Sequence, residues 1–476
     1  MKEAAKIQDV TFRYASGDAG ALDGLDLTIG QGECVLLCGG SGCGKTTVTR
    51  LLNGLIPHYY EGDLTGTVTV FGQSVRETAI EALAGTVGSV FQDPRSQFFC
   101  VDTTSEIAFG CENMGLPEQE ILRRVDKTTA DMHIRPLLGR SIFDLSGGEK
   151  QKIACAGVAA MLPELIVLDE PTSNLDLDAI GELREIIRKW RSQGKTIVIA
   201  EHRLGWLEGL CDRVLYMEDG RITRAFTGER FFSFDTEQLN GMGLRALRTA
   251  HPYLTSRTGL TQIKPFDGRE VLTLEGFRYA YGKHTALAID RLTLPQGAVI
   301  AVIGHNGAGK STFTRCLCGL QKGFKGKVTI GGRTYRPREM LRQSYMVMQD
   351  VDHQLFAETV LEETMLGAEE TDLAAAMEIL EPLQIAACKD RHPMSLSGGQ
   401  KLRVAIASAL MAGKSLLVFD EPTSGLDFRS MEQTAQLLRS VGRELTVLIV
   451  THDMELIDRC CTHLLHIEGG TVTHDL

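Results

Sequence analysis

Gly39-Gly40-Ser41-Gly42-Cys43-Gly44-Lys45-Thr46 is a glycine-rich stretch that recurs later in the chain as Gly304-His305-Asn306-Gly307-Ala308-Gly309-Lys310-Ser311. Both copies fit the P-loop pattern G-x-x-x-x-G-K-[ST]. Its glycines leave backbone N–H groups free to converge on phosphate oxygens at the start of a helix, whose dipole favours anions. The lysines would supply a charge to the terminal phosphates, and Thr46 and Ser311 a hydroxyl ligand for Mg²⁺. Together with Thr47 and Thr312, which follow directly, the two stretches predict two binding sites for nucleoside triphosphates.

The composition limits the kind of protein. The chain has 476 residues, of which 43% are hydrophobic, so we expect about two to four packed domains. A net charge of −11 without a basic block argues against a large nucleic-acid footprint. The apolar runs fall well short of the roughly 18 residues that span a bilayer, and the N-terminus carries no apolar signal-peptide core. The 12 cysteines form no C-x-x-C pair, and we expect them to be reduced thiols in a cytosol.

The repeat extends beyond the P-loops and locates the domains. Phe12-Arg13-Tyr14, for example, matches Phe277-Arg278-Tyr279. We predict a first nucleotide-binding domain over residues 1–226 and a second over residues 270–476. The segment between them, residues 227–269, has no counterpart and contains several prolines and glycines that break regular structure, so it is predicted to be a linker.

Each copy alternates short apolar segments with helical patterns. The apolar runs at 34–38, 165–168 and 196–200 are continuous, as in parallel strands that are covered on both faces. The stretch from about residue 102 to residue 161 is mostly helical in pattern. We therefore predict two tandem α/β domains of the P-loop type, each with a mainly parallel sheet, an inserted helical subdomain and an antiparallel β element.

Two acidic residues end an apolar strand in each copy: Asp169-Glu170 closes LIVLDE, and Asp420-Glu421 closes LLVFDE. Such residues lie at the carboxyl edge of a parallel sheet, where ligands of open α/β folds bind. The aspartates, Asp169 and Asp420, are candidate ligands for Mg²⁺. The glutamates, Glu170 and Glu421, are candidates to orient and polarise the attacking water in nucleotide hydrolysis.

Ser146-Gly147-Gly148-Glu149 and Ser397-Gly398-Gly399-Gln400 both have the form of a capping box at the start of a helix. A cap does not need the two glycines, which strip side chains from the helix N-terminus and so let a phosphate approach it. Each copy already has a phosphate-binding P-loop. The simplest interpretation is that each Ser-Gly-Gly end covers the nucleotide held by the other copy.

This ordered set of motifs resembles the nucleotide-binding domains of ABC ATPases over nearly the whole chain. The resemblance implies a head-to-tail arrangement with two composite ATP sites, each using the P-loop and strand-end acids of one copy and the Ser-Gly-Gly end of the other. It also implies three pairs of site residues: Gln92 and Gln349, which contact Mg²⁺ and the attacking water; His202 and His452, the switch histidines near the γ-phosphate; and Tyr14 and Tyr279, which stack on adenine, with Tyr281 as a rival of Tyr279.

Neither copy lacks a catalytic group, so we expect both sites to hydrolyse ATP. The departures from the family pattern are small. Glu149 replaces the usual glutamine, and Arg203 replaces the aspartate that the second copy has as Asp453. These departures are compatible with two unequal sites and do not remove a catalytic group from either.

The residues after each glutamine narrow the class of transporter. Gln92-Asp93-Pro94-Arg95-Ser96-Gln97-Phe98-Phe99 and Gln349-Asp350-Val351-Asp352-His353-Gln354-Leu355-Phe356 share the pattern Q-D-x-x-x-Q-[FL]-F. This resembles the ATPases of energy-coupling factor importers for vitamins and metal ions, in which the segment grips a transmembrane coupling subunit and a separate membrane subunit binds the substrate. The resemblance implies a peripheral protein on the cytoplasmic face of the cell membrane. Core packing is the alternative role for the two apolar residues that end each pattern.

Two other classes of protein remain open. Simple-sugar importers also use duplicated ATPases, but their second copy usually departs from the motifs, which this one does not. Soluble ABC proteins that act on ribosomes or DNA would be expected to carry a basic linker, cysteine-rich metal sites or iron–sulfur ligands. The linker here is nearly neutral, so we expect no nucleic-acid partner.

Cys43 lies inside the first P-loop, where the second copy has Ala308. A thiol at a helix N-terminus beside Lys45 is expected to favour its thiolate, which would make Cys43 the most reactive cysteine of the chain. The alternative is a buried and inert thiol that fills a gap behind the loop.

Overall fold

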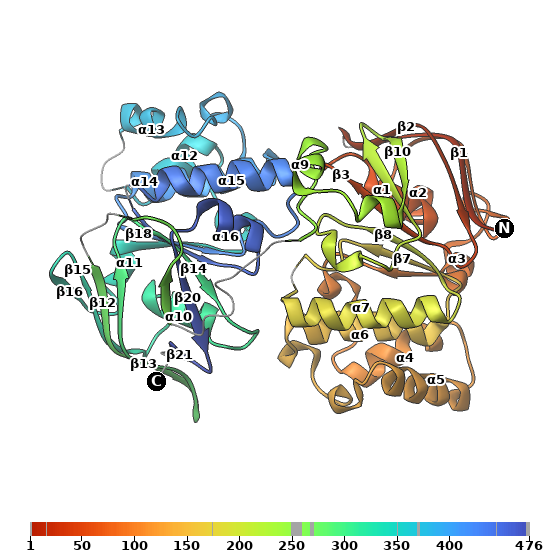
Figure 1. Cartoon of the computed structure of the whole chain (residues 1–476), viewed down its shortest axis with the longest axis horizontal. Coiled ribbons are helices and arrows are strands. Elements are labelled where there is room, and N and C mark those ends of the chain that lie inside the picture. Colours follow the sequence, from red (N-terminus) through yellow and green to blue (C-terminus); the bar gives the residue numbers. More distant parts are fainter. Residues whose placement is uncertain are drawn as a thin grey trace. The chain divides into compact units, whose positions relative to one another are not determined.

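Figure 1 shows the computed structural model, which describes residues 2–15, 17–173, 175–248, 259–266, 271–349, 351–368, 372–443 and 445–472. The chain divides into two units, and the division falls between residues 248 and 249. Each unit contains one mainly parallel sheet and one antiparallel sheet, which confirms the predicted fold class. Among the helices that the structure describes, none combines the length and apolar composition that a bilayer crossing requires.

The parallel sheet of the first unit has the strand order β10-β9-β3-β8-β7-β6, in which only β10 runs antiparallel to its neighbour. Alternate residues of β3 enter different cores: Leu36 and Cys38 pack on one face, and Val35 and Leu37 on the other. This explains the unbroken apolar runs, because both faces are covered. The strands are β3 (Cys34–Gly39), β6 (Val87–Val90), β7 (Leu165–Asp169), β8 (Thr196–Ala200), β9 (Arg213–Glu218) and β10 (Arg221–Thr227).

An antiparallel sheet, β2-β1-β4-β5, shares the second of these cores with helix α1 (Lys45–Leu52), which leaves the P-loop. The other face is covered by helix α7 (Leu177–Ser192), whose buried stripe includes Leu183 and Ile187. The remaining elements on the two faces are β1 (Glu3–Tyr14), β2 (Gly17–Gly30), α2 (Leu55–His58), β4 (Gly62–Val70), β5 (Gln73–Ser74), α3 (Ile80–Thr86) and, on the α7 face, the 3₁₀ turn η4 (Gly205–Leu207).

The predicted helical subdomain is present between β6 and β7. Its helices share a separate apolar core that includes Ile107, Val125 and Ile153. The elements are η1 (Pro94–Gln97), α4 (Thr103–Asn113), α5 (Glu118–Asp131), η2 (Arg135–Leu137), η3 (Ile142–Asp144) and α6 (Gly147–Met161).

The first part of the predicted linker packs onto the first unit. Helices α8 (Gly228–Phe231) and α9 (Thr236–Gly241) place Phe231 and Leu239 in the core with no exposed surface. The unit therefore extends beyond residue 226, where the repeat ends. Residues 249–258 and 267–269 of the predicted linker lie outside the described residues.

The second unit repeats this plan with the sheet order β11-β20-β14-β19-β18-β17 and an antiparallel sheet β13-β12-β15-β16. Strand β11 comes from the predicted linker and pairs with β20. The strands are β11 (Leu260–Gln262), β12 (Val271–Tyr281), β13 (His284–Pro295), β14 (Val299–Ile303), β15 (Lys325–Ile330), β16 (Arg333–Tyr335), β17 (Ser344–Val347), β18 (Leu416–Asp420), β19 (Thr446–Val450), β20 (His463–Glu468) and β21 (Thr471–Val472). The helices are α10 (Lys310–Leu317), α11 (Met340–Gln343), η6 (Val351–Gln354), α12 (Val360–Met365), α13 (Leu373–Leu380), η7 (Ala386–Cys388), η8 (Pro393–Ser395), α14 (Gly398–Met411), α15 (Phe428–Val441) and α16 (Met454–Cys460).

Candidate functional site

The first P-loop connects β3 to α1 and folds around its lysine. The Lys45 ammonium is buried and donates hydrogen bonds to the carbonyl oxygens of Gly39, at 3.1 Å, and Gly40, at 3.0 Å. Gly39 has a φ of 149°, and a Cβ there would lie 2.2 Å from the Met217 carbonyl oxygen. Glycine is therefore required at this position, and the loop holds a positive charge at the helix N-terminus.

The second P-loop, between β14 and α10, has the same geometry. Lys310 Nζ donates to the carbonyl oxygens of Gly304, at 2.7 Å, and His305, at 2.9 Å. A Cβ on Gly304 would lie 2.0 Å from the Ile467 carbonyl oxygen. In addition, His305 Nδ1 lies 2.7 Å from the Glu468 carboxylate. This hydrogen bond holds the pKa of Glu468 below its ordinary value. Both loops thus have the same backbone conformation around the lysine, and both place a positive charge at a helix N-terminus.

Each unit brings a P-loop hydroxyl to the aspartate at the end of the neighbouring strand. Thr46 Oγ1 donates to Asp169 Oδ1 at 3.1 Å. Burial, reinforced by the nearby Glu170 charge, raises the pKa of Asp169 to about 6. Burial also raises the pKa of Asp420, and a hydrogen bond from Ser311 partly opposes that shift. A hydroxyl beside a buried carboxylate is the hard-oxygen donor set that Mg²⁺ prefers, so these residues fit the expected metal.

The glutamate that follows this aspartate meets the predicted glutamine and histidine in the first unit. The Glu170 carboxylate accepts a hydrogen bond from Gln92 Nε2 at 3.0 Å and lies 3.2 Å from His202 Nε2. In the second unit the corresponding separation of His452 Nε2 from Glu421 is 3.9 Å. The structure therefore brings the glutamate, the glutamine and the histidine together in the first unit, and the glutamate and the histidine in the second.

Both glutamates lie in the left-handed region, with φ of 44° for Glu170 and 48° for Glu421. The left-handed conformation costs a residue other than glycine about 1–3 kcal/mol, and residues held in it cluster at functional sites. The Glu170 N–H donates to the Ala200 carbonyl oxygen at 2.8 Å, and the Glu421 N–H to that of Val450 at 2.9 Å. These backbone bonds hold the turn that aims each carboxylate away from its strand. Gln349 follows β17 as Gln92 follows β6.

The two Ser-Gly-Gly segments begin helices, as predicted, and both capping boxes form. Ser146 Oγ accepts from the Glu149 N–H at 3.3 Å, and Ser397 Oγ accepts from the Gln400 N–H at 3.4 Å. In the second unit, a Cβ added to Gly398 or Gly399 would meet no atom of the described residues within 4 Å. Local packing therefore does not explain these glycines, whereas the approach of a ligand would.

The comparison with known families decides the identity. The profile described as "ABC transporter" matches residues 22–173 and 287–424, one match in each unit. The chain belongs to the ABC transporter family. A further profile, described as "AAA domain, putative AbiEii toxin, Type IV TA system", matches residues 395–458 within the second match region and beyond it. The chain is thus the ATP-binding subunit of an ABC transporter and carries two ABC domains.

Relatives of this ABC protein match along its whole length. A "Putative ABC transporter ATP-binding protein" of Treponema denticola is 42% identical over 471 residues, which cover 99% of this chain and 96% of that protein. The "Putative HMP/thiamine import ATP-binding protein YkoD" of Bacillus subtilis is 31% identical over 500 residues, with coverage of 99% and 91%. The solved structure "Model of ribosome-bound archaeal Pelota and ABCE1" shares the fold, with a TM-score of 0.66, 22% identity and coverage of 98% of this chain and 78% of that chain.

The tyrosines that were expected at adenine differ in exposure between the two ABC domains. Tyr14 is half-buried, and its hydroxyl lies 3.1 Å from Thr47 Oγ1 on the P-loop helix. In the second domain it is Tyr281, not Tyr279, whose hydroxyl lies near the equivalent Thr312, at 3.5 Å. Tyr279 packs against the core, whereas Tyr281 is 49% exposed.

The Q-D-x-x-x-Q-[FL]-F segments are pinned to the ABC domains at two points. The second glutamine returns to its strand: Gln97 Nε2 donates to the Ser89 carbonyl oxygen at 3.0 Å, and Gln354 Nε2 to that of Met346 at 2.7 Å. A buried glutamate then holds the end of the segment. Glu106 accepts from the N–H groups of residues 99 and 100, at 2.9 and 2.8 Å, and Glu363 from those of residues 356 and 357, both at 2.8 Å.

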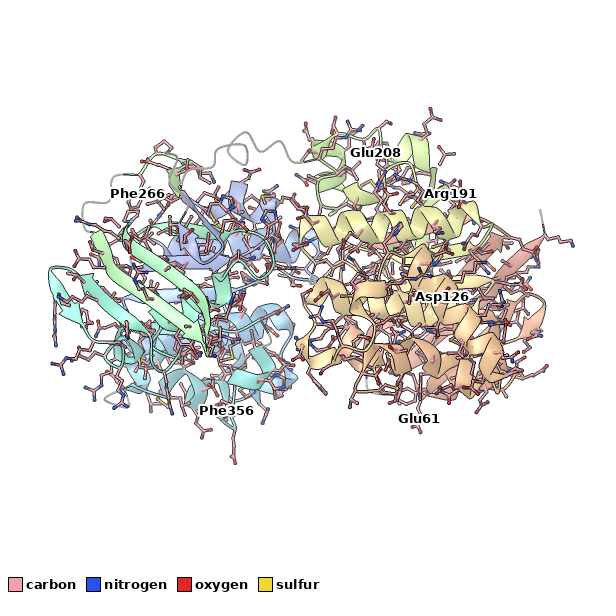
Figure 2. The ribbon with its side chains drawn as sticks, turned by 90° about the horizontal axis from the view of Figure 1, so that it is seen from below. Glu61, Asp126, Arg191, Glu208, Phe266 and Phe356 are labelled. Carbon is pink, nitrogen blue, oxygen red and sulfur yellow. The ribbon has the colours of Figure 1, made fainter. Side chains whose placement is uncertain are left out.

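The four apolar residues that end the two patterns fall into two classes, one buried and one exposed. Phe98 packs against the helical core and Leu355 is 5% exposed, so core packing holds for these two. Phe99 is 74% exposed and Phe356 is 78% exposed. Figure 2 shows Phe356 at the rim of its unit. In each domain, a loop held by hydrogen bonds therefore leaves one apolar side chain exposed.

The prediction of a reactive Cys43 is wrong. Cys43 is 7% exposed and belongs to the apolar core behind the loop. Burial raises the pKa of the thiol, and the opposing effect of Lys45 is smaller. The thiol is the inert alternative, because desolvation outweighs the nearby charge.

Sequence reasoning noted Asp453 only as a difference between the copies, and it missed Glu201 and the threonine that each of these carboxylates binds. Glu201 and Asp453 are both buried and each accepts a hydrogen bond from a threonine of its own domain. The first copy has Glu-His-Arg at this place and the second has Thr-His-Asp. Each triplet contains one carboxylate, before the histidine in the first copy and after it in the second. Comparing the triplets as units, and not position by position, could have found this exchange.

Proposed function

We propose that this chain hydrolyses ATP at two sites and powers a membrane importer of the energy-coupling factor type. The observation that carries the proposal is the meeting of three predicted groups in each domain: the P-loop lysine, the hydroxyl–aspartate pair and the strand-end glutamate beside its histidine. The absence of any degenerate motif supports hydrolysis at both sites.

The residues of each domain divide the chemistry among themselves. Lys45 and the loop N–H groups bind the β- and γ-phosphates, which are anionic and match the helix N-terminus. Mg²⁺, when bound, neutralises charge on the transferred phosphoryl group; Thr46, Asp169 and Gln92 would hold it. Glu170 orients the attacking water and accepts its proton, and His202 lies beside Glu170 where it can contact the γ-phosphate.

The second site uses the equivalent residues Lys310, Ser311, Gln349, Asp420, Glu421 and His452. We propose that Ser397, Gly398 and Gly399 cover the nucleotide of the first P-loop, and Ser146, Gly147 and Gly148 that of the second. The unfilled space around Gly398 and Gly399 supports this role. For adenine we favour Tyr14 and Tyr281, because Tyr281 rather than Tyr279 makes the contact that Tyr14 makes in the first domain.

The docking proposal rests on the exposed loop ends. Phe99, Val101 and Phe143 are 74%, 69% and 78% exposed, and the segments that carry them pair, with the Ile142 N–H donating to the Val101 carbonyl oxygen at 3.0 Å. Phe356 and Met394 occupy matching positions in the second domain and are 78% and 45% exposed. We call these exposed residues of each domain the docking surface of that domain. Exposed apolar patches of this kind mark interaction sites.

The type of importer is supported by the likeness to YkoD, whose printed description is an import ATP-binding protein for HMP/thiamine. We propose that the docking surface of each domain binds a transmembrane coupling subunit at the cytoplasmic face of the cell membrane and that a separate membrane subunit binds the substrate. Gln92 and Phe99 lie on one pinned segment, so the state of the nucleotide site reaches the partner through this segment.

Hydrolysis is tested by replacing both glutamates. The double variant Glu170→Gln/Glu421→Gln should bind ATP as the parent chain does and lose about 10²–10⁴-fold in hydrolysis rate, because a general base contributes that much. Steady-state ATPase assays with a parallel nucleotide-binding assay measure both. A double variant that hydrolyses ATP at the parental rate would contradict the catalytic assignment. Copurification from membranes, with identification of the bound subunits, tests the importer type.

A further inference from the structure

The surface around helix α11 of the second domain is basic, although the chain as a whole is acidic. Residues 320–342 contain seven lysines or arginines and one carboxylate, whereas the whole chain has a net charge of −11. All seven cations are exposed, and they lie on or beside β15, β16 and α11, which are labelled in Figure 1. No two of them are adjacent in the sequence, so the sequence shows no basic block. They are Lys322, Lys325, Lys327, Arg333, Arg336, Arg338 and Arg342.

The charge of these side chains is not neutralised within the domain. Among the described residues, none of the seven cations forms an ion pair with a carboxylate. The single acid of this stretch, Glu339, instead accepts a hydrogen bond from the Arg336 N–H at 2.6 Å. Arg333 lies over the Tyr335 ring, 5.1 Å from its centroid. The positive charges therefore remain available to an external anion.

Two exposed leucines lie close together among these cations. Leu320 is 44% exposed and Leu341 is 45% exposed. Leu320 follows Gly319, where a Cβ would lie 2.4 Å from the Pro337 carbonyl oxygen and 3.3 Å from Leu341 Cγ. The turn after α10 is thus packed against the start of α11. The leucines and the three cations nearest to them in the sequence form what we call the basic patch: Leu320, Lys322, Arg338, Leu341 and Arg342.

The first domain shows that the fold does not require this patch. Counted back from the strand that follows, β6 or β17, Ala84 and Gly85 occupy the positions of Leu341 and Arg342. The same scaffold therefore folds without this leucine and this cation. The hairpin β4–β5 also has neutral residues where β15–β16 has cations, namely Thr65, Thr67 and Gln73 against Lys325, Lys327 and Arg333.

The combination of cations and leucines favours an anionic lipid surface as the partner. Lysine and arginine are attracted to the negative headgroups of a membrane, and each contributes separately to binding. Exposed leucines can enter the boundary between headgroups and acyl chains. A single-stranded nucleic acid would call for aromatic side chains on which bases stack, and the basic patch contains none.

We propose that the basic patch of the second domain binds anionic lipid headgroups of the membrane in which the importer lies. This inference rests on the proposed function, which places the chain at a membrane, and it adds a direct lipid contact to the docking of a protein subunit. Salt screens an attraction between charges, whereas the docking surface of each domain contributes apolar contacts. The basic patch therefore assists attachment at low salt and does not replace docking.

The test mixes the full-length chain with protein-free vesicles at low salt and measures the bound fraction by flotation. The parent chain should bind vesicles that contain phosphatidylserine and not vesicles of phosphatidylcholine alone, and added salt should weaken the binding. Lys322→Gln/Arg338→Gln/Arg342→Gln should weaken it about 100-fold, since each cation contributes about fivefold. Leu320→Ser/Leu341→Ser should weaken it about tenfold, because less apolar surface leaves water.

The matched control removes the same charge from exposed ion pairs of the first unit. It is Arg123→Gln/Arg188→Gln/Arg221→Gln, and it should bind the vesicles as the parent does. All three variants change exposed residues outside the proposed ATP sites. They should therefore keep the melting temperature and the ATPase activity of the parent.

Four results would overturn the inference: no binding of the parent to either kind of vesicle, equal binding to both kinds, binding retained by the triple patch variant, or an equal loss in the control. Binding of the parent to a single-stranded oligonucleotide but not to vesicles would make the partner a nucleic acid instead. The vesicles contain no transporter subunit, so the result does not depend on docking. The proposed function fails separately, if the double glutamine variant still hydrolyses ATP at the parental rate or if no membrane subunit copurifies with the chain.

Discussion

At the scale of one residue, the ionised carboxylate of Asp169 lowers the stability of the metal-free fold. Its carboxylate is buried at the end of β7, and its pKa is raised from an ordinary value of 3.8 to about 6. Folding therefore favours the protonated form of this group. The ionised group weakens the fold as pH rises through about 6, and this penalty is absent below the ordinary pKa of aspartate. A bound cation would offset it, which is consistent with the metal role proposed above.

We predict that Asp169→Asn stabilises the metal-free chain at pH 8 by about 1–3 kcal/mol, since each unit of pKa shift corresponds to about 1.4 kcal/mol. Asparagine keeps the size of the side chain and can still accept from Thr46. Thermal melts at pH 8 and pH 4, without Mg²⁺ and with excess Mg²⁺, measure the difference. The gain should vanish near pH 4, and Mg²⁺ should stabilise only the parent. A variant that is less stable than the parent at pH 8 would show that the charge is already compensated.

The cysteines give a second prediction at this scale. Of the 12 cysteines, 11 are buried, and Cys100 alone is partly exposed, one residue after Phe99. We expect a maleimide to label Cys100 in the folded chain and to leave Cys43 unlabelled, with no loss of ATPase activity. Peptide mapping after brief labelling identifies the modified thiol. Label on Cys43, prevented by Mg-ATP, would restore the reactive-thiol interpretation that burial now excludes.

At the scale of an element, the pinned segments explain why one apolar residue of each pair is exposed and its neighbour is not. In an extended stretch successive side chains point to opposite sides, so the anchors at Gln97 and Glu106 fix which side Phe99 takes. The exposed side chains are then available to a partner without cost to the core.

We predict opposite outcomes for neighbouring substitutions in this element. Phe99→Ser/Phe356→Ser should keep the melting temperature and the ATPase activity of the isolated chain and should lose association with membranes. Leu355→Ser, the matched control one residue earlier, should lower the free energy of unfolding by about 2–5 kcal/mol, because Leu355 is buried. Melting curves and membrane flotation separate the two. Membrane binding retained by the stable double variant would contradict the docking surface.

The repeat allowed most of these elements to be predicted, and it failed where the two copies differ. P-loops, strand ends and capping boxes depend on local sequence and periodicity, so the sequence alone predicts them. The exchange of Glu201 for Asp453 was not predicted, because an alignment of the two copies pairs Asp453 with Arg203. The common threonine partner of the two carboxylates is visible only in the structure. The burial of Phe98 and Leu355 beside their exposed neighbours escaped because it depends on side-chain hydrogen bonds that pin the segment, which the sequence pattern does not reveal. Helices α8 and α9 escaped because they have no counterpart in the second copy.

At the scale of the whole chain, α8 and α9 decide where the first ABC domain ends. Phe231 and Leu239 have no exposed surface, and Leu244 has 3%, so this segment completes the core beneath α7. The Tyr216 hydroxyl on β9 also donates to the Met242 carbonyl oxygen at 2.7 Å. We propose on this basis that the domain runs to Arg248, with a shorter linker than the repeat suggests.

We therefore predict that a fragment of residues 1–248 folds and binds ATP, whereas a fragment of residues 1–226 does not fold stably. Each fully buried large apolar side chain contributes about 1.5–3 kcal/mol, and a domain is stable by only about 5–15 kcal/mol in total. Losing Phe231, Leu239 and Leu244 together removes a large part of that margin and leaves the apolar face beneath α7 open to water. Far-UV circular dichroism melts and a nucleotide-binding assay on both fragments measure the difference. The variant Phe231→Ser/Leu239→Ser in the longer fragment separates the lost packing from the shorter length: if it melts as the unsubstituted fragment does, the segment is a linker that merely lies on the domain, and the boundary belongs near residue 226.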